Sequence, residues 1–426
     1  MKLSSGLCLF VLLASTGSAF GTYATGTVFP TIVVDNSTGD QSQPHVSGNY
    51  ASYNVVTLGG VNLIGYYSFS PPGNGNVPSA ANFIDSLSDV NGSNIVFTRI
   101  NTTLGASSIF KYVIGGTSTE VAPVAPPAVA MRSNPAIGGN TEIWEDVGVT
   151  SDMSSEMVLS TDGITTHRVT NDVFADTNPN VSPTGNVVVW EKCSGTDCDV
   201  YAAIAPAWAP QAVANSSANE TWPDTNGAQI VFASNAGGVE HVYVTTLGGV
   251  ATQIPTSTAT QDHPAIANNF VAYEGGTVSS HDIYVYDLTS GTTYQITNTP
   301  ADNELLSDIA VSDTTVRVVW QVSGGATGSD VYATEFTVAS AEPPNITDLI
   351  NVIDSFNLPQ GIANSLKAKL TAAQASLAAG DTTAACNEIG AFINEVEAQS
   401  DKKLKVPEAN QLKTLAQQLQ QSLGCP

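Results

Sequence analysis

The sequence Val187-Val188-Val189-Trp190, followed by Asp199-Val200-Tyr201, is one copy of a unit that recurs along this chain of 426 residues. In each copy an apolar run ends in an aromatic residue, and a run of a polar, a β-branched and an aromatic residue follows shortly after. A repeat of this length is typical of one four-stranded blade of a β-propeller. The recurring aromatics, at intervals of 44, 47, 46, 42, 41 and 47 residues, are Tyr53, Phe97, Trp144, Trp190, Phe232, Tyr273 and Trp320.

Seven copies of the unit predict an all-β seven-bladed β-propeller, with six blades as the alternative, followed by a small all-α helical bundle. Radial repetition buries each sheet against its neighbours and leaves only short edges. The last unit breaks at Pro343-Pro344 before its outer strand. We expect the segment from Phe29 to Val34 to supply this strand and to close the ring.

The N-terminus is typical of a secretory signal, with Lys2 before an apolar run and the small residues Gly17-Ser18-Ala19 after it. The apolar run is too short to span a bilayer, and no other candidate span is present. We therefore expect a secreted, extracellular or cell-surface protein. Its predicted parts are a signal peptide over 1–19, a propeller over 20–342, a linker at 343–344 and a helical domain over 345–426.

Acidic residues dominate the predicted propeller. Only six basic residues of the mature chain precede Pro344, against 30 acidic ones, which gives this region a formal charge of about −24. A domain of this charge repels nucleic acids and anionic membranes. It either attracts cations or a basic partner, or it serves to keep an exported protein soluble.

The mature chain has an even number of cysteines, which is typical of a protein folded in an oxidising compartment. Cys193 and Cys198 lie between two strands of the fourth blade, and Cys386 and Cys425 lie in the helical tail. We expect a disulfide within each pair. Zinc is the alternative for Cys193 and Cys198, but no second pair or nearby His completes a set of four ligands.

The blades resemble those of the TolB-type propeller superfamily. The shared unit is Asp-x-x-Pro-x-Ile/Val, then the apolar run with its aromatic, then Asp-Ile/Val-Tyr. The resemblance covers residues 27–338 and is strongest in Asp176 to Ala203 and in Gln261 to Thr297. It implies the blade architecture of that group.

The tail after Pro344 changes to helical periodicity. Asn345 is placed to cap a first helix, Gly380 ends a second, Asp381 caps a third, and Pro407 suits the first turn of a fourth. The tail resembles the FIMAH module of secreted polysaccharide-active and surface proteins. The matching residues are Leu366-Lys367-Ala368-Lys369-Leu370, Ala384-Ala385-Cys386-Asn387, Ala391-Phe392-Ile393-Asn394-Glu395-Val396 and Cys425.

Known catalytic motifs are missing from the sequence. It contains no Gly-x-Ser-x-Gly, no His-Glu-x-x-His and no phosphate-binding glycine-rich loop, and the tail is too short for the hydrolase domain of a propeller peptidase. We therefore expect no catalytic residues. His45 and His263 each flank an inner-strand proline, so they are candidates to line the channel and bind a ligand. The alternative is that neither has a ligand.

A calcium site is a second candidate. The segment from Asp35 to Asp40 offers oxygen ligands at suggestive spacing, but it lacks the complete loop and its distal Glu. We therefore expect no cofactor or metal, with calcium at Asp35 and Asp40 as the alternative.

These observations favour a monomeric, non-catalytic binding or scaffold protein that presents an acidic propeller surface to a protein, glycan or cation. Its expected partner is a protein or polysaccharide at the cell surface, with no nucleic acid and no membrane span. The alternative is a carbohydrate-active enzyme, similar to polysaccharide lyases, that holds a metal in the propeller channel.

Overall fold

The computed structural model describes residues 29–123, 131–147, 153–255, 258–277, 280–299, 302–312, 314–325, 328–337, 345–356, 358–400 and 402–425. The expected secretory signal and the Pro343-Pro344 linker lie outside these residues, so the predicted domain bounds stay predictions. The described residues divide into two compact units, one within 29–337 and the other within 345–425. Each unit is described by itself.

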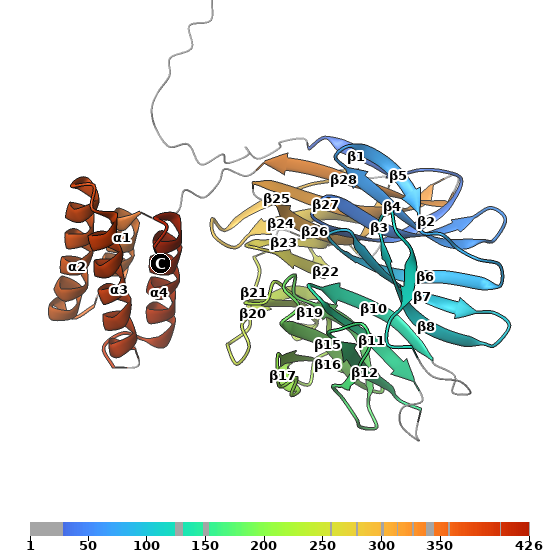
Figure 1. Cartoon of the computed structure of the whole chain (residues 1–426), viewed down its shortest axis with the longest axis horizontal. Coiled ribbons are helices and arrows are strands. Elements are labelled where there is room, and N and C mark those ends of the chain that lie inside the picture. Colours follow the sequence, from blue (N-terminus) through green and yellow to red (C-terminus); the bar gives the residue numbers. More distant parts are fainter. Residues whose placement is uncertain are drawn as a thin grey trace, which may run out of the picture. The chain divides into compact units, whose positions relative to one another are not determined.

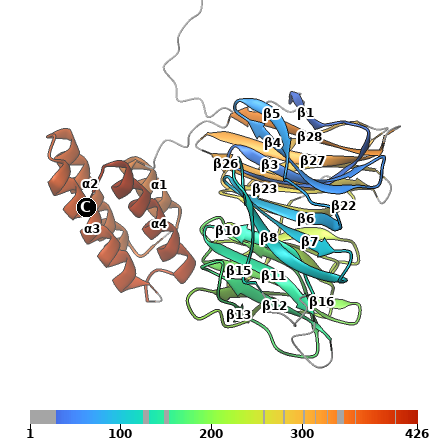
Figure 2. The ribbon, with the colours of Figure 1, turned by 45° about the vertical axis from the view of Figure 1, so that its right-hand side comes forward.

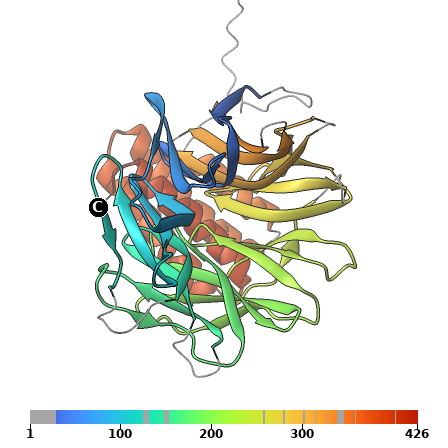
Figure 3. The ribbon, with the colours of Figure 1, turned by 90° about the vertical axis from the view of Figure 1, so that its right-hand side faces the viewer.

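The first unit contains seven four-stranded antiparallel sheets arranged around a common centre (Figure 1, Figure 3). The prediction of a seven-bladed propeller followed by four helices is therefore confirmed, and the six-bladed alternative is wrong. The innermost strands are β2 (Gly39–Ser47), β6 (Phe83–Asn91), β10 (Arg132–Gly138), β14 (Ala175–Val181), β18 (Glu220–Thr225), β22 (Thr260–Ala267) and β26 (Asn303–Ser312). The second strands are β3 (Tyr50–Thr57), β7 (Asn94–Asn101), β11 (Thr141–Val147), β15 (Val187–Ser194), β19 (Ile230–Ser234), β23 (Phe270–Thr277) and β27 (Thr315–Gly325).

The outer half of each blade completes the sheet. The third strands are β4 (Asn62–Phe69), β8 (Ala106–Val113), β12 (Ser155–Ser160), β16 (Asp197–Ile204), β20 (His241–Thr245), β24 (Ser280–Asp287) and β28 (Gly328–Thr337). The outermost strands of the first six blades are β5 (Pro72–Asn76), β9 (Ser118–Glu120), β13 (His167–Arg168), β17 (Gln211–Ala214), β21 (Thr252–Gln253) and β25 (Thr292–Gln295). In the seventh blade this place is taken by β1 (Thr31–Asp35), which pairs with β28 as predicted.

The recurring aromatics form the inter-blade core. All seven lie on second strands and are at most 3% exposed. In five blades the aromatic contacts the aromatic that ends the next run, because the two are cross-strand neighbours. Ring centroids in these five pairs lie 5.6–6.5 Å apart: Phe97–Phe110, Trp190–Tyr201, Phe232–Tyr243, Tyr273–Tyr284 and Trp320–Tyr332.

A disulfide joins the two strands of the hairpin in the fourth blade. Cys193 on β15 is bonded to Cys198 on β16, and the two residues are also register partners in the sheet. The predicted pairing is confirmed. With both sulfurs in a disulfide, neither cysteine offers a thiolate to zinc.

The second unit is a bundle of four helices (Figure 2). They are α1 (Ile346–Ser355), α2 (Gln360–Ala378), α3 (Thr382–Gln399) and α4 (Val406–Ser422). Asn345 caps α1 in a reciprocal capping box with Asp348, and the Asp381 side chain caps α3 by accepting from the Ala384 N–H at 2.9 Å. The core is apolar, with Leu349, Leu366 and Phe392 among its fully buried residues.

The second predicted disulfide, Cys386–Cys425, is also present. It ties α3 to the segment that follows α4. In the part of the chain described here, no helix combines the length and apolar character needed to cross a lipid bilayer. The two disulfides are consistent with an extracellular protein.

Candidate functional site

Each of the seven inner strands is interrupted at one equivalent position by a β-bulge. The residue at the bulge has a positive φ between 44° and 54°, a conformation that is uncommon outside glycine. Its repetition in every blade makes it part of the blade design. We call these residues the bulge layer: Gln43, Leu87, Asn134, Asn178, Trp222, His263 and Leu306.

Side chains from the preceding blade hold five of these bulges in place. In each case the side chain belongs to the residue that directly follows the repeat aromatic, and it accepts a hydrogen bond from the bulge N–H. The donor and acceptor pairs are Gln43 N to Gln321 Oε1 (3.2 Å), Asn134 N to Thr98 Oγ1 (3.2 Å), Asn178 N to Glu145 Oε1 (3.1 Å), Trp222 N to Glu191 Oε1 (2.7 Å) and Leu306 N to Glu274 Oε1.

A second layer lies two residues further along each inner strand. We call it the acid layer, because three of its seven members are aspartates. The members are His45, Asp89, Ala136, Asn180, Asp224, Ala265 and Asp308.

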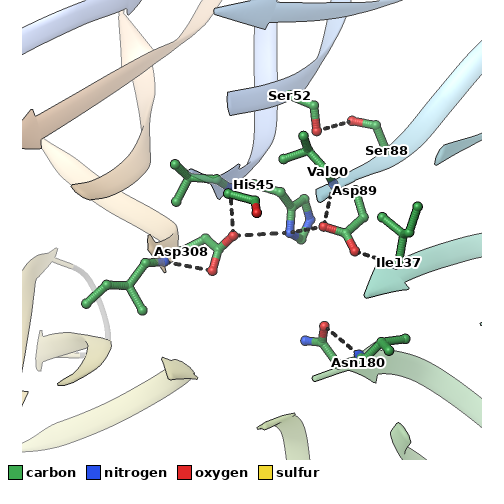
Figure 4. A network of polar contacts seen from close by, with 12 residues as sticks. His45, Ser52, Ser88, Asp89, Val90, Ile137, Asn180 and Asp308 are labelled. Carbon is green, nitrogen blue, oxygen red and sulfur yellow. Dashed lines mark hydrogen bonds and ion pairs between the residues drawn. The ribbon is translucent and has the colours of Figure 1, made fainter. Parts of the chain in front are cut away.

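The three aspartates of the acid layer link neighbouring blades. Each accepts a hydrogen bond from the N–H that follows the acid-layer residue of the next blade: Asp89 from Ile137 (2.7 Å), Asp224 from Ile266 (2.6 Å) and Asp308 from Val46 (2.8 Å). Figure 4 shows the link between Asp89 and Ile137. Their first role is therefore structural.

His45 lies between two of these aspartates (Figure 4). Its Nδ1 atom is 3.6 Å from Asp308 Oδ2 and 3.8 Å from Asp89 Oδ1. Burial lowers the pKa of His45, but the hydrogen bond to Asp308 and the charge of Asp89 outweigh burial and raise the pKa to about 9. His45 is therefore an imidazolium at neutral pH, and it neutralises part of this side of the layer.

Asp224 lies in the fifth blade, away from His45 in the ring order. Burial, with the negative charge of Asp308 adding to it, raises the pKa of Asp224 to about 7. Burial also raises the pKa of Asp89, to about 6, although the charge of His45 opposes the shift. The acid layer thus gains negative charge as the pH rises from 5 to 8.

Two aromatic rings meet in the bulge layer. The Trp222 indole and the His263 imidazole have ring centroids 4.0 Å apart, and Trp222 stays 38% exposed. His263 Nδ1 lies 3.3 Å from both Asp262 Oδ2 and Glu274 Oε1. Burial lowers the pKa of His263, but the hydrogen bond to Asp262 and the charge of Glu274 outweigh burial and raise it.

Residues of both layers line one cavity of about 390 Å³ at the centre of the propeller. Its wall contains four carboxylates, from Asp89, Glu145, Asp224 and Asp308, and two histidines. No lysine or arginine of the described residues lines it. Apolar surface comes from Leu87, Leu306 and Trp222, so the cavity combines apolar contacts with few, placed polar groups, as small-ligand sites do.

Both candidate histidines lie where the sequence placed them, on the wall of the central cavity. His45 belongs to the acid layer of the first blade and His263 to the bulge layer of the sixth. Whether either binds a ligand stays a prediction. In the described part of the chain, the group with metal-ligating atoms close together is Glu191 with Cys193 and Cys198, and both of these cysteines are in a disulfide.

The candidate calcium ligands have separate local roles. Asp35 on β1 accepts hydrogen bonds from Ser37 N (2.9 Å) and from the Tyr53 hydroxyl (3.1 Å). Asp40 on β2 accepts from Ser329 N at 3.1 Å. Calcium binding at these residues stays a prediction.

Sequence reasoning missed Trp222 and the three aspartates of the acid layer. Alignment of the blades on their repeat aromatics would have found part of the layer, because Asp89 and Asp224 each lie eight residues before their aromatic, whereas Asp308 lies twelve before Trp320. Trp222 differs from the seven repeat aromatics in lying on an inner strand.

Comparison with known proteins identifies the helical unit. The FIMAH domain family matches residues 347–421, which confirms that resemblance. No curated protein sequence matches the chain.

The propeller is similar in fold to solved structures of peptidases. A puromycin-hydrolyzing peptidase of Mycobacterium tuberculosis matches at 14% identity, over 72% of this chain and 54% of that protein, with a TM-score of 0.54. A prolyl endopeptidase matches at 14% identity, over 71% of this chain and 47% of that one, with a TM-score of 0.54. The aligned region spans about half the length of both.

A third structure is a propeller domain alone. This domain of the trilobed protease of Pyrococcus furiosus matches at 12% identity, over 72% of this chain and 97% of that one, with a TM-score of 0.52. It is described as having an open velcro topology, whereas β1 closes the last blade here. At these identities the likeness shows the fold. The resemblance to TolB thus holds for the β-propeller architecture.

These comparisons correct the expectation of a non-catalytic binding or scaffold protein, together with its lyase-like alternative. The three propellers described above belong to peptidases. The expectation treated the lack of a catalytic motif in this chain as the lack of a role in catalysis. A missing motif does not exclude a part in catalysis, so the inference was wrong.

Proposed function

We propose that this chain takes part in peptide hydrolysis outside the cell, as the part that binds and selects the peptide in the propeller channel. The observation that carries the proposal is the central cavity, with its exposed indole and its carboxylates. The peptidase propellers of the same fold support it. Because the sequence contains no Gly-x-Ser-x-Gly motif, the hydrolytic step is not assigned to residues of this chain.

The wall of the cavity offers what an extended peptide requires. A peptide backbone presents donors and acceptors, and the Asn134 and Asn178 side chains in the bulge layer carry both. Their Nδ2 atoms also donate to Glu145 and Glu191 within the propeller, which holds the two amides in place. Leu87, Leu306 and Trp222 offer apolar contact to peptide side chains. The expected signal and the two disulfides support an extracellular location. We also propose that the blades are related to the TolB group beyond their shared architecture, and that the protein is a monomer.

The tryptophans offer a direct test. Of the five, Trp222 is 38% exposed in the cavity, while Trp144, Trp190, Trp208 and Trp320 are at most 7% exposed. Acetylated and amidated peptides Ala-Ala-Xaa-Ala-Ala, with Gln, Glu, Lys or Arg at Xaa, are titrated into the full chain. We expect a saturable change in tryptophan emission, matched by heat in calorimetry.

The control is Trp222→Leu. Leucine is the bulge residue of two other blades, as Leu87 and Leu306, so it suits this position in the fifth blade. This variant should keep its fold and lose the emission change. If none of the four peptides gives saturable heat with the folded wild-type protein, the proposed function is wrong.

A further inference from the structure

The cavity carries an excess of negative charge, and no lysine or arginine of the described propeller residues neutralises it. Five of the six basic residues of the predicted propeller form ion pairs with carboxylates that do not line the cavity. These pairs are Arg99–Asp85, Lys111–Glu142, Arg132–Asp146, Lys192–Asp172 and Arg317–Glu335. The sixth, Arg168, donates to Asn171 on an outer edge of its blade.

Within the cavity the imbalance is concentrated at Asp224. Asp89 and Asp308 share the His45 imidazolium, at 3.8 and 3.6 Å. Asp224 is only 9% exposed, and the charges that act on it most strongly are those of Asp308 and Asp89. A buried carboxylate among carboxylates is costly unless a cation lies beside it.

An exposed aromatic ring stands on the same strand, two residues away. Trp222 and Asp224 both line the cavity from β18. The His263 ring lies against the indole, which still keeps 38% of its surface accessible. An indole beside a carboxylate suits an ammonium or guanidinium group, which is attracted to the ring and pairs with the acid.

We propose that the channel selects peptides that carry a lysine or arginine side chain, which packs against Trp222 and pairs with Asp224. This inference rests on the proposed function and names its substrate class. An acidic side chain in the same place would meet four carboxylates, opposed only by the imidazoles of His45 and His263, so acidic peptides should bind most weakly.

The test compares the four capped peptides by calorimetry on the full chain. Their termini carry no charge, so only the central residue differs. We expect Arg and Lys to bind about tenfold more tightly than Gln, since hydrogen bonds to charged groups are worth this much, and Glu to bind most weakly.

The variant Asp224→Asn removes the charge and keeps an oxygen for the Ile266 N–H. The protein itself has Asn180 at the equivalent position of the fourth blade, so the substitution fits the blade. We expect this variant to lose the preference for Arg and Lys over Gln. The matched control is Glu120→Gln, which removes one charge from an outermost strand and should keep the preference.

Proton release gives a second readout. Burial holds the pKa of Asp224 at about 7, among Asp308, Asp89 and His45, and a bound cation would lower that pKa. Binding of the Arg peptide at pH 6.5 should therefore release protons, seen as heats that depend on the buffer, and Asp224→Asn should reduce the release.

Equal affinities for all four peptides, or a preference that survives in Asp224→Asn, would overturn this inference and leave peptide binding standing. Failure of every peptide to bind would overturn the proposed function and this inference together.

Discussion

The propeller and the helical unit handle their acidic residues in opposite ways. In the described chain every buried acidic side chain lies in the propeller, with Glu142, Glu156 and Asp176 fully buried among them. In the helical unit, ion pairs such as Lys413–Glu397 lie at the surface. Helices satisfy their own backbone, whereas the bulged inner strands leave N–H groups that only a neighbouring blade can bond. Buried carboxylates are therefore part of how this propeller holds together.

The two units can be followed separately in one sample. All five tryptophans precede residue 338, and the helical unit contains no tryptophan or tyrosine. Tryptophan emission thus reports unfolding of the propeller, and circular dichroism at the helical minimum reports mainly the bundle. Each prediction below uses this separation.

The largest expected effect comes from a repeat aromatic. Trp190 is fully buried, and its Nε1 donates to Asp176 at 2.8 Å. Trp190→Ala leaves a cavity and an unpaired buried carboxylate, so we expect a loss of about 3–5 kcal/mol from the free energy of unfolding of the propeller. Calorimetry should show the helical transition unchanged. The exposed Trp222→Leu serves as the comparison, and an equal loss in that variant would contradict this account of the core.

The next effect belongs to the helical unit. Replacing Cys386 and Cys425 by serine opens a loop with a sequence separation of 39. The entropy of the unfolded chain then rises, which should destabilise the bundle by about 3–4 kcal/mol. Cys193 and Cys198 are separated by only 5, so their double replacement should cost about 2 kcal/mol, and it should act on the propeller. If the melting temperature of the helical unit does not change when Cys386 and Cys425 are replaced, the bundle does not depend on this disulfide.

The smallest effect is the response of the propeller to pH. Burial raises the pKa of Asp224 and Glu304 to about 7 and that of Asp89 to about 6, so the folded state holds more protons than the unfolded state between pH 4 and 7. Stability present near pH 4 is therefore lost as the pH rises through these values. His45 acts in the same direction, because its pKa is raised to about 9 and its contribution is lost as the pH rises through that value.

We expect the propeller to lose stability between pH 5 and pH 8, which should be measured as a lower melting temperature at pH 8 than at pH 5. In the helical unit burial raises the pKa of Glu395, but the hydrogen bond from Lys369 outweighs burial and lowers it. That pair contributes stability above the ordinary pKa of a glutamate, so the bundle should not weaken over this range. A propeller that gains stability towards pH 8 would refute the role given to its buried carboxylates.

Most of the fold could be predicted, because it depends on local patterns that recur along the sequence. The repeat aromatics mark the second strands, and the caps at Asn345 and Asp381 mark the helix starts. Even the pairing of β1 with β28 follows from the missing outer strand of the last unit. Each of these signals acts over a few residues or recurs at a fixed interval.

The site was only half predictable. The prolines beside His45 and His263 placed these residues at the channel, but nothing local to Asp224 or Trp222 shows that they face the same cavity. Their juxtaposition depends on a bulge that sets the register of each inner strand, and on the closure of the ring. The hydrogen bond from Trp222 N to Glu191 joins residues 31 apart in the sequence, and the equivalent bonds of other blades join residues 32, 33 and 36 apart, so no fixed spacing reveals them.

The pairing of β1 with β28 sets an order of events during biosynthesis. Thr31 pairs with Thr334, so β1 stays unpaired until β28, the last strand of the propeller, has been synthesised. Until β1 pairs with it, β28 has an open edge that can accept the same strand from another copy of the chain. Crowded nascent chains would thereby exchange their first strands, so dilution or rapid export during synthesis should favour the closed single ring.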